Sequence, residues 1–318
     1  MAIDVHAHCV PDGLVDALTR DEARIGVEVP PLAPLLSDLP ARLEAMDRMG
    51  VHRQLISPFI GLTAYHLDAP AGRRYTRLFN ELMAATVQKA PDRLSALATV
   101  PLQSGWAAAG ELLHAITQLG MVGVEIATAT PSTSLDDKAL APFWEAADDL
   151  GCLVLIHPNA GHRGHEPYFL GNFVGNPAET TMAVARLMFG GILDDYPRIR
   201  FCLAHGGGFL PYQLGRLERG YAIYGKKKGA RLRSTPRELV RRLYYDTVLH
   251  SPDMIRFLVD LVGPKHVLLG SDYPFEMGDS DPLGTLAAIP GLEPADRDLI
   301  AGGNAELLST NAAGVSGR

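Results

Sequence analysis

The chain has 318 residues, 47% of them hydrophobic and 20% charged, and a formal net charge of -7 at pH 7 with a pI of about 5.9. This composition is that of an ordinary globular protein, and one α/β barrel domain commonly has this length, so we expect residues 1–318 to form a single domain. The acidic balance argues against nucleic acid or an anionic membrane as a partner, since both require a basic face, and leaves a small molecule as the expected ligand.

Short apolar runs recur along the chain with longer amphipathic stretches between them. This alternation is the pattern of βα units around a parallel sheet. Eight such runs in a chain of this length predict a (β/α)8 TIM barrel, whose active site lies at the carboxyl ends of the strands. The predicted strands are Ala2–His6, Arg53–Ser57, Leu94–Val100, Val122–Ala127, Leu153–His157, Arg200–Ala204, Leu243–Asp246 and Val267–Gly270.

Helices are predicted in the stretches that separate these strands. Thr235 before Pro236 and Ser251 before Pro252 have the pattern of a capping hydroxyl followed by proline at the first helical position. The predicted helices include Leu39–Met49, Gly72–Lys89, Trp106–Leu119, Leu140–Leu150, Pro177–Phe189, Pro236–Arg242 and Pro252–Val262.

Two longer segments, residues 9–36 and 158–176, are interpreted as irregular. Each follows a predicted strand, and long connections in compact domains are commonly lids or binding loops. We therefore expect both to overhang the mouth of the barrel as lid-like loops, with plain surface loops as the alternative. Proline is frequent in the first, and glycine is mixed with aromatic residues in the second: Pro30, Pro31, Pro34, Tyr168, Phe169 and Phe173.

Neither the ends of the chain nor its cysteines indicate secretion. No basic and apolar leader precedes the first run, and no apolar stretch has the length of a membrane span, so we expect a cytoplasmic protein. Residues 312–318 have the composition of a disordered tail. Cys9, Cys152 and Cys202 each lie beside a predicted strand, where a small thiol packs well, and they form no disulfide framework.

Histidine and aspartate residues follow several of the predicted strands. His6 and His8 are two residues apart, so their side chains project from the same face of a strand and can bind one metal ion together. His157, His205 and Asp272 each end a strand run of their own. Because the carboxyl ends of barrel strands meet at one rim, these five side chains predict a metalloenzyme site.

His205 is followed by three glycines, residues 206–208, which let the backbone turn sharply and let a ligand approach closely. We therefore expect its imidazole to reach the metal site and to transfer protons there, rather than to be buried and satisfied by backbone carbonyls. The other histidines lie at isolated helix or loop positions that favour ordinary roles. His162 and His165 are intermediate, because their loop is expected above the metal.

Seven short motifs follow one another from the first predicted strand to the last. They are Ile3–His8, Val100–Gln103, Ile156–Pro158, Pro177–Thr180, His205–Gly208, Leu214–Arg216 and Leu269–Phe275. With these motifs the chain resembles the metal-dependent decarboxylase branch of the amidohydrolase superfamily, and within it the family similar to 2-amino-3-carboxymuconate-6-semialdehyde decarboxylase. The resemblance covers nearly the whole chain. It implies a decarboxylase, a carboxy-lyase, that acts on a small carboxylate.

The resemblance also implies the roles of the five strand-end residues. His6, His8, His157 and Asp272 correspond to metal ligands, and His205 corresponds to the acid/base group, with Asp272 sharing its proton transfer. Three imidazoles and one carboxylate leave an open position on a divalent ion, for which zinc fits best and manganese is the alternative.

The fourth predicted strand bears on the number of metal ions. Two-metal members of the superfamily carry a bridging lysine there, and residues 121–126 contain none, so we expect a single ion. Glu125 in this strand has two interpretations. It either enters the pocket and contacts the substrate, or it forms a structural pair with a neighbouring arginine.

A decarboxylase must hold a carboxylate, which an arginine fork normally does. The resemblance implies an arginine after the first strand, but residues 26–32 contain none, and the family's pocket tryptophan is most nearly replaced by Tyr168. Lys226–Lys228 would reach a neighbouring subunit's site in the homodimer that the family implies, or form a solvated loop. The candidate anion contacts are Arg20, Arg24, Arg163 and Arg216.

The sequence thus favours a mononuclear metal-dependent, non-oxidative decarboxylase of an aromatic or unsaturated carboxylate with a neighbouring hydroxyl, amino or carbonyl group. A hydrolase or hydratase that uses metal-bound hydroxide has the same ligands and is the alternative. A structural or regulatory barrel without turnover is a third class, disfavoured by the open coordination position and by His205.

Overall fold

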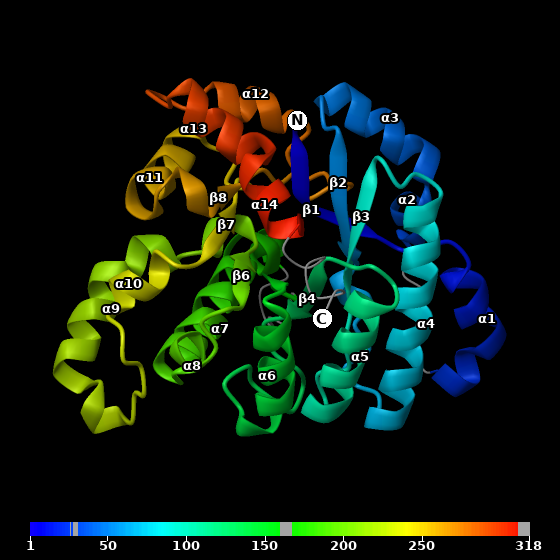
Figure 1. Cartoon of the computed structure of the whole chain (residues 1–318), viewed down its shortest axis with the longest axis horizontal. Helices are drawn as coiled ribbons and strands as arrows, with labels where there is room; N and C mark the ends of the chain where they lie inside the picture. The colour runs from blue at the N-terminus through cyan, green and yellow to red at the C-terminus, as the bar shows by residue number, and fades with distance from the viewer. Residues whose placement is uncertain (26, 28–30, 160–166, 311–318) are drawn as a thin grey trace.

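The computed structural model describes residues 1–25, 27, 31–159 and 167–310. Its centre is a sheet of eight parallel strands whose spatial order follows the chain, and helices surround this sheet (Figure 1). The strands are β1 (Ile3–Cys9), β2 (Arg53–Pro58), β3 (Leu94–Ala98), β4 (Gly123–Ala127), β5 (Leu153–His157), β6 (Arg200–Leu203), β7 (Tyr244–Asp246) and β8 (Val267–Leu268).

The chain that continues β8 closes the sheet against β1. The backbone N–H of Val5 donates to the carbonyl of Leu269 at 2.9 Å, and that of Asp272 donates to the carbonyl of His6 at 2.8 Å. The predicted (β/α)8 barrel is therefore confirmed. Its first and last strands lie side by side, which brings the two ends of the sequence to one seam.

Helices connect the strands on the outside of the barrel. Leu39–Met49 and Pro252–Val262 are helical at the predicted residues, and the side chains of Thr235 and Ser251 cap their helices as expected. The helices are α1 (Leu14–Ile25), α2 (Ala33–Ser37), α3 (Leu39–Met49), α4 (Ala69–Gln88), α5 (Gly105–Thr117), α6 (Ala141–Leu150), α7 (Asn176–Phe189), α8 (Ile192–Asp195), α9 (Leu210–Tyr224), α10 (Pro236–Val240), α11 (Pro252–Val262), α12 (Pro282–Ala287), α13 (Pro294–Asp298) and α14 (Asn304–Thr310).

The prediction that residues 9–36 form an irregular loop is wrong, because α1 and α2 occupy much of this segment. Leu14 and Leu18, four residues apart, are both buried on one face of α1. Pro34 lies in the first turn of α2, where proline is tolerated because no helical N–H bond is lost there. Proline was therefore a helix-start signal in this segment and not a sign of irregular chain.

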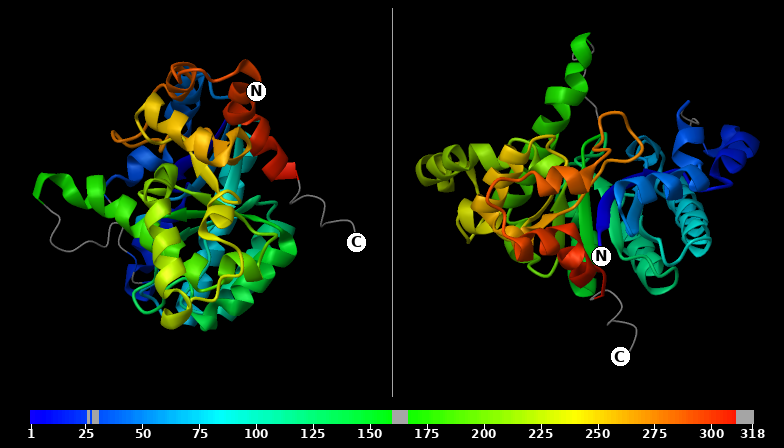
Figure 2. Two further views of the ribbon diagram at one scale, coloured as in Figure 1. Left: turned by 90° about the vertical axis from the view of Figure 1, so that its left-hand side faces the viewer. Right: turned by 90° about the horizontal axis from the view of Figure 1, so that it is seen from above.

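Residues 167–175 project from the barrel together with the start of α7, as both views of Figure 2 show. Its described part contains a short turn, η3 (Pro167–Phe169), and a π-helical turn, η4 (Gly171–Gly175). The expectations for His162, Arg163 and His165, and for the tail 312–318, lie outside the described residues.

The core has two layers. Inside the barrel, Val5, Leu97 and Leu155 pack together with Leu308 of α14, while a larger apolar layer fills the space between strands and helices. Cys9, Cys152 and Cys202 are buried free thiols, as expected. Among the described residues, no helix combines the length and the apolar character needed to cross a membrane.

Candidate metal and active site

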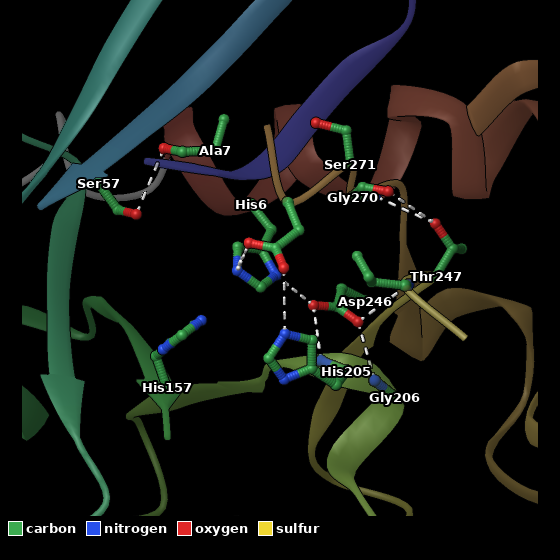
Figure 3. A network of polar contacts seen from close by, with 12 residues as sticks. His6, Ala7, Ser57, His157, His205, Gly206, Asp246, Thr247, Gly270 and Ser271 are labelled. Carbon is green, nitrogen blue, oxygen red and sulfur yellow. Dashed lines mark hydrogen bonds and ion pairs between the residues drawn. The ribbon is translucent and has the colours of Figure 1, made fainter. Parts of the chain in front are cut away.

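The five strand-end side chains meet at the carboxyl end of the barrel. His6 Nε2 lies 3.2 Å from His8 Nε2, and Asp272 Oδ1 lies 3.3 Å and 3.2 Å from these two nitrogens. One ligand atom from each of His6, His157, His205 and Asp272 lies within 4.8 Å of the others. Figure 3 shows His6, His157 and His205 around one point. The predicted convergence of these residues is therefore present in the structure.

Three of the histidines are oriented by hydrogen bonds on their outer nitrogens. The Nδ1 atoms donate to Asp246 Oδ2 at 2.6 Å from His6, to the Pro58 carbonyl at 3.1 Å from His8, and to the Pro158 carbonyl at 2.6 Å from His157. Because each Nδ1 faces an acceptor, each Nε2 directs a lone pair inward, which is the usual arrangement of metal-binding histidines.

The inner atoms of the cluster are arranged as if around a cation. The lone pairs of His6 Nε2 and His8 Nε2 face each other at 3.2 Å, where they repel unless a positive charge lies near both. His157 Nε2 and Asp272 Oδ1 are buried and make no hydrogen bond with any described residue. The donor set, with its orphaned atoms, fits a divalent metal ion.

The electrostatics of the cluster also favour a positive charge. Burial opposes protonation of His6, but the carboxylates of Asp272 and Asp246 outweigh it and raise the pKa of His6 to about 9. Burial and the neighbouring histidines lower the pKa of His157 well below its usual value. Burial opposes the charge of Asp272, but His6 and His205 overcome it and hold its pKa well below the ordinary range. A neutral imidazole and an ionised carboxylate are the forms that bind metal.

His205 differs from the other three histidines. Its Nε2 lies 3.4 Å from Asp272 Oδ2, and its Nδ1 is buried without a hydrogen bond to any described residue. A metal-binding histidine normally donates from its second nitrogen to an oxygen, as His6, His8 and His157 do. The absence of such an acceptor sets His205 apart from the ligand pattern and fits a group that exchanges protons with Asp272.

The backbone at His205 and Asp272 is strained. Both residues have positive φ angles, +56° and +58°, in the left-handed region that side chains disfavour. After His205 the glycines continue with positive φ, and a Cβ on Gly208 would lie 2.2 Å from the Pro177 carbonyl oxygen. The expectation that these glycines permit a sharp turn is confirmed. The close approach of a ligand to them stays a prediction.

Asp246 at the end of β7 is a residue whose role the sequence analysis missed. Its carboxylate accepts from His6 Nδ1 and from the backbone N–H groups of His205, Gly206 and Val248. It therefore positions one proposed ligand and the proposed acid/base residue together (Figure 3). The available signal was that Leu243–Asp246 ends in an acidic residue at the same rim as the other strands.

A second missed network lies behind the cluster. Asp4 accepts from the Ser271 hydroxyl at 2.5 Å and from Gln54 Nε2 at 2.8 Å. Arg42 donates to Gln54 Oε1 at 2.8 Å and to the backbone carbonyl of His8 at 2.5 Å. These buried bonds join β1, β2 and the chain after β8 beneath the proposed ligands.

The residues predicted to contact the substrate do not all lie at the metal cluster. Glu125 is fully buried, its Oε2 lies 3.8 Å from His8 Nδ1, and burial raises its pKa. Tyr168 is 85% exposed on the projecting segment. Arg163 lies outside the described residues, and nothing is described of the Arg24 side chain. Their roles in binding substrate stay predictions.

Two further predicted contacts lie elsewhere. Arg20 is on the exposed face of α1, where its Nε donates to the carbonyl of Asp16. Arg216 lines a surface groove between α7 and α9, together with Lys228 of the exposed turn η6 (Lys226–Lys228). Neither arginine is among the residues that line the pocket at the metal cluster.

A pocket of about 420 Å³ opens above the cluster, with His205 and Asp272 in its lining. Its volume is in the range of small-molecule sites. Phe173 lines it, as predicted for the segment after β5. The opposite walls come from the start of α9 and from α11, including Phe209, Tyr212 and Phe257.

Comparison with known proteins places the chain in a family. The family model described as amidohydrolase matches residues 3–308. The chain is 31% identical over 270 residues to 2-amino-3-carboxymuconate-6-semialdehyde decarboxylase of Dictyostelium discoideum, covering 84% of this chain and 75% of that protein. It is 26% identical to 2-keto-4-carboxy-3-hexenedioate hydratase of Sphingobium sp. (strain NBRC 103272 / SYK-6), covering 89% of this chain and 86% of the relative.

A solved structure with a similar fold is also a decarboxylase. The crystal structure of 5-carboxyvanillate decarboxylase from Sphingomonas paucimobilis superposes with a TM-score of 0.87 at 27% identity, covering 97% of this chain and 98% of the other. The chain therefore belongs to the amidohydrolase family, as its motifs indicated.

Proposed function

We propose that the protein is a mononuclear metal-dependent, non-oxidative decarboxylase of an aromatic or unsaturated carboxylate that bears a neighbouring hydroxyl, amino or carbonyl group. The observation that carries the proposal is the cluster of three inward Nε2 atoms and Asp272. Asp272 and His205 also line a largely apolar pocket. The decarboxylases among the relatives support this reaction class.

In this proposal His6, His8, His157 and Asp272 hold one divalent ion. Zinc is favoured by the nitrogen-rich ligand set, and manganese is the alternative. A bound ion would supply positive charge near the substrate carboxylate and near negative charge that develops during the reaction. Asp246 and the carbonyls of Pro58 and Pro158 keep the three imidazoles aimed at it.

The protein's own groups handle the proton. His205 and Asp272 face each other through Nε2 and Oδ2, so a proton can pass between them. This proton is added to the carbon that carries the carboxylate. The bond between that carbon and the carboxylate then breaks, carbon dioxide leaves, and the electron pair of the broken bond returns to the conjugated system. The apolar walls keep water away from the protonated carbon.

Hydrolysis or hydration is the second candidate, because the same ligands could activate water. The hydratase among the relatives favours this alternative. Product analysis in heavy-oxygen water separates the two classes. Metal-loaded protein is incubated with hydroxylated aromatic acids, carboxymuconate semialdehydes, esters, amides and unsaturated diacids. Loss of carbon dioxide without labelled oxygen in the remaining product supports decarboxylation, whereas incorporation of labelled oxygen overturns it.

We also propose a cytoplasmic homodimer, in line with the family resemblance. Light scattering of the purified protein tests the oligomeric state. A monomer at all concentrations would overturn the dimer and, with it, any contribution of Lys226–Lys228 to a neighbouring site.

A further inference from the structure

A second hollow lies between the starts of α4 and α5, two helices that are neighbours on the outside of the barrel (Figure 1). This α4–α5 hollow has a volume of about 510 Å³. It shares no lining residue with the pocket at the metal cluster, so it is a separate feature of the described structure. It is lined by Ala69, Pro70, Arg73, Arg74, Arg77 and Ala107.

The two sides of the hollow are held together by close packing. Gly72 in the first turn of α4 faces Gln103, which precedes α5, and a Cβ on this glycine would lie 2.0 Å from Gln103 Nε2. The same nitrogen donates to the carbonyl of Leu67, just before α4, at 3.1 Å. The chain on both sides is therefore positioned before a ligand binds, which lowers the cost of binding one.

Arg77 is oriented by a buried carboxylate. Its Nε lies 3.3 Å and 3.0 Å from the two oxygens of Glu111, which is fully buried in α5. Asn80 Nδ2 donates to Glu111 Oε1 at 2.9 Å and holds this carboxylate from the other side. The Nη atoms of Arg77 make no hydrogen bond with any described residue, and the side chain is 33% exposed. Its outer donors are therefore available to a ligand.

The other two arginines of the hollow have no partner of their own. Arg73 and Arg74 are exposed, and their side chains make no hydrogen bond or ion pair with any residue that the structure describes. Arg77 is one helical turn away from both, at a spacing where like charges repel. No carboxylate is among the described lining residues, although the whole chain has a net charge of -7. An anion in the hollow would relieve this repulsion.

A phosphate group matches these donors. Each guanidinium presents its N–H groups as a planar fork that fits phosphate oxygens, and a doubly charged anion can accept from several forks at once. We propose that the α4–α5 hollow binds the phosphate group of a small molecule through Arg73, Arg74 and Arg77. The proposal does not depend on the proposed reaction, because it concerns a separate site and its readout is binding.

Calorimetry with inorganic phosphate and with AMP tests this site. The metal-loaded protein is titrated in about 0.15 M sodium chloride, which largely screens unspecific attraction to surface charge. In the double variant Arg73→Gln/Arg74→Gln, we expect the affinity to fall by about 10-fold to 100-fold, because two charged hydrogen-bonding partners are lost. The matched control Arg20→Gln/Arg48→Gln removes the same charge from exposed positions of α1 and α3 and should bind like the parent protein.

Arg77→Lys tests the orientation of the third arginine. Lysine keeps a positive charge beside Glu111 but lacks the planar fork, so the affinity should fall by about tenfold. Urea unfolding of the same variant is expected to give a midpoint close to that of the parent protein. This second measurement separates a loss of binding from a loss of folding.

The two probes distinguish the possible sources of the phosphate group. Equal affinities support the proposal with free phosphate as the ligand. Tighter binding of AMP supports it with a phosphorylated organic molecule, whose ring would cover Trp106, the 79% exposed neighbour of Ala107.

The metal cluster is a competing place for an anion. Binding there would be equal in the parent protein and in both arginine variants, and this result overturns the proposal. Absence of binding by the parent protein up to about 10 mM of either probe also overturns it.

Discussion

Two polar clusters in this protein are built around an aspartate, and they differ in completeness. Both oxygens of Asp194 in α8 are paired: Oδ1 accepts from Ser234 Oγ and Arg242, and Oδ2 accepts from the backbone N–H groups of Arg233 and Ser234. In the metal cluster next to Asp246, His157 Nε2 and His205 Nδ1 are buried and make no hydrogen bond with any described residue. In a cluster that only stabilises the fold, the buried polar atoms are paired with one another. In a cluster that binds a ligand, some buried polar atoms stay without a partner in the protein and can contact the ligand.

The two clusters also differ in whether the protein itself balances their charges. Burial opposes the charge of Asp194, but hydrogen bonds from Ser234 and the backbone outweigh it and lower its pKa to about 2. That carboxylate has its partners in the folded chain. In the Asp246 cluster, by contrast, the raised pKa of His6, to about 9, reflects a demand for positive charge at the centre.

Among the substitutions proposed, His157→Ala should have the largest effect on metal content and activity, because it removes one inward Nε2 from the metal cluster. We expect bound metal to fall below about a tenth of an equivalent and kcat/KM to fall by about 1,000-fold or more. Elemental analysis and product assays measure the two. His266→Ala is the control, since this histidine donates to the carbonyl of Leu243 at the other end of the barrel. Full metal content in His157→Ala would remove it from the ligand set.

His205→Gln should separate metal binding from proton transfer. We expect the metal content to stay at that of the parent protein while kcat falls by about 100-fold to 10,000-fold. The physical reason is that His205 contacts Asp272, while its Nδ1 makes no hydrogen bond with any residue that the structure describes. Loss of metal in this variant would instead make His205 a ligand.

Asp246→Asn should give an intermediate effect. The amide weakens the acceptor for His6 Nδ1 and for the backbone at His205, so metal affinity should fall by about 10-fold to 100-fold. Competition with a chelator measures this affinity. An unchanged affinity would show that the histidines hold their orientation without Asp246.

Asp194→Asn should leave metal binding intact and reduce stability. The pKa of Asp194 is about 2 in the folded protein and about 4 in the unfolded chain. The ionised carboxylate therefore stabilises the folded state at pH values above about 4, and this stabilisation is lost as the pH falls toward about 2. We expect the variant to be less stable by about 2 kcal/mol at pH 7, with a difference that narrows between about pH 5 and pH 3. Urea unfolding at several pH values measures it. A difference independent of pH would contradict the role of this charge.

The sequence predicted the barrel and the cluster well because both follow from local patterns. Alternating faces of a strand bring His6 and His8 together, and strand ends place His157, His205 and Asp272 at one rim. The structure confirms this convergence.

What the sequence did not predict depends on contacts between distant segments. Nothing near Asp246 indicates that it accepts from His6, which is 240 residues away in the chain. The pocket wall includes Phe209, which precedes α9, and Met254 at the start of α11. Both are exposed and resemble ordinary surface residues in the sequence, and only the fold of the barrel brings them to one opening. Helix α1 was missed because nearby prolines outweighed the Leu14 and Leu18 pattern.

The seam between β1 and the chain after β8 has a consequence for how the protein is made. Asp4 and Ser271, which are 267 residues apart in the sequence, join there, beside His6 and Asp272. A ribosome must therefore release almost the whole chain before these two proposed ligands can meet. Metal loading would be a late event in biosynthesis, and an ion held across this seam would close a loop of nearly the full chain, as a long-range cross-link does.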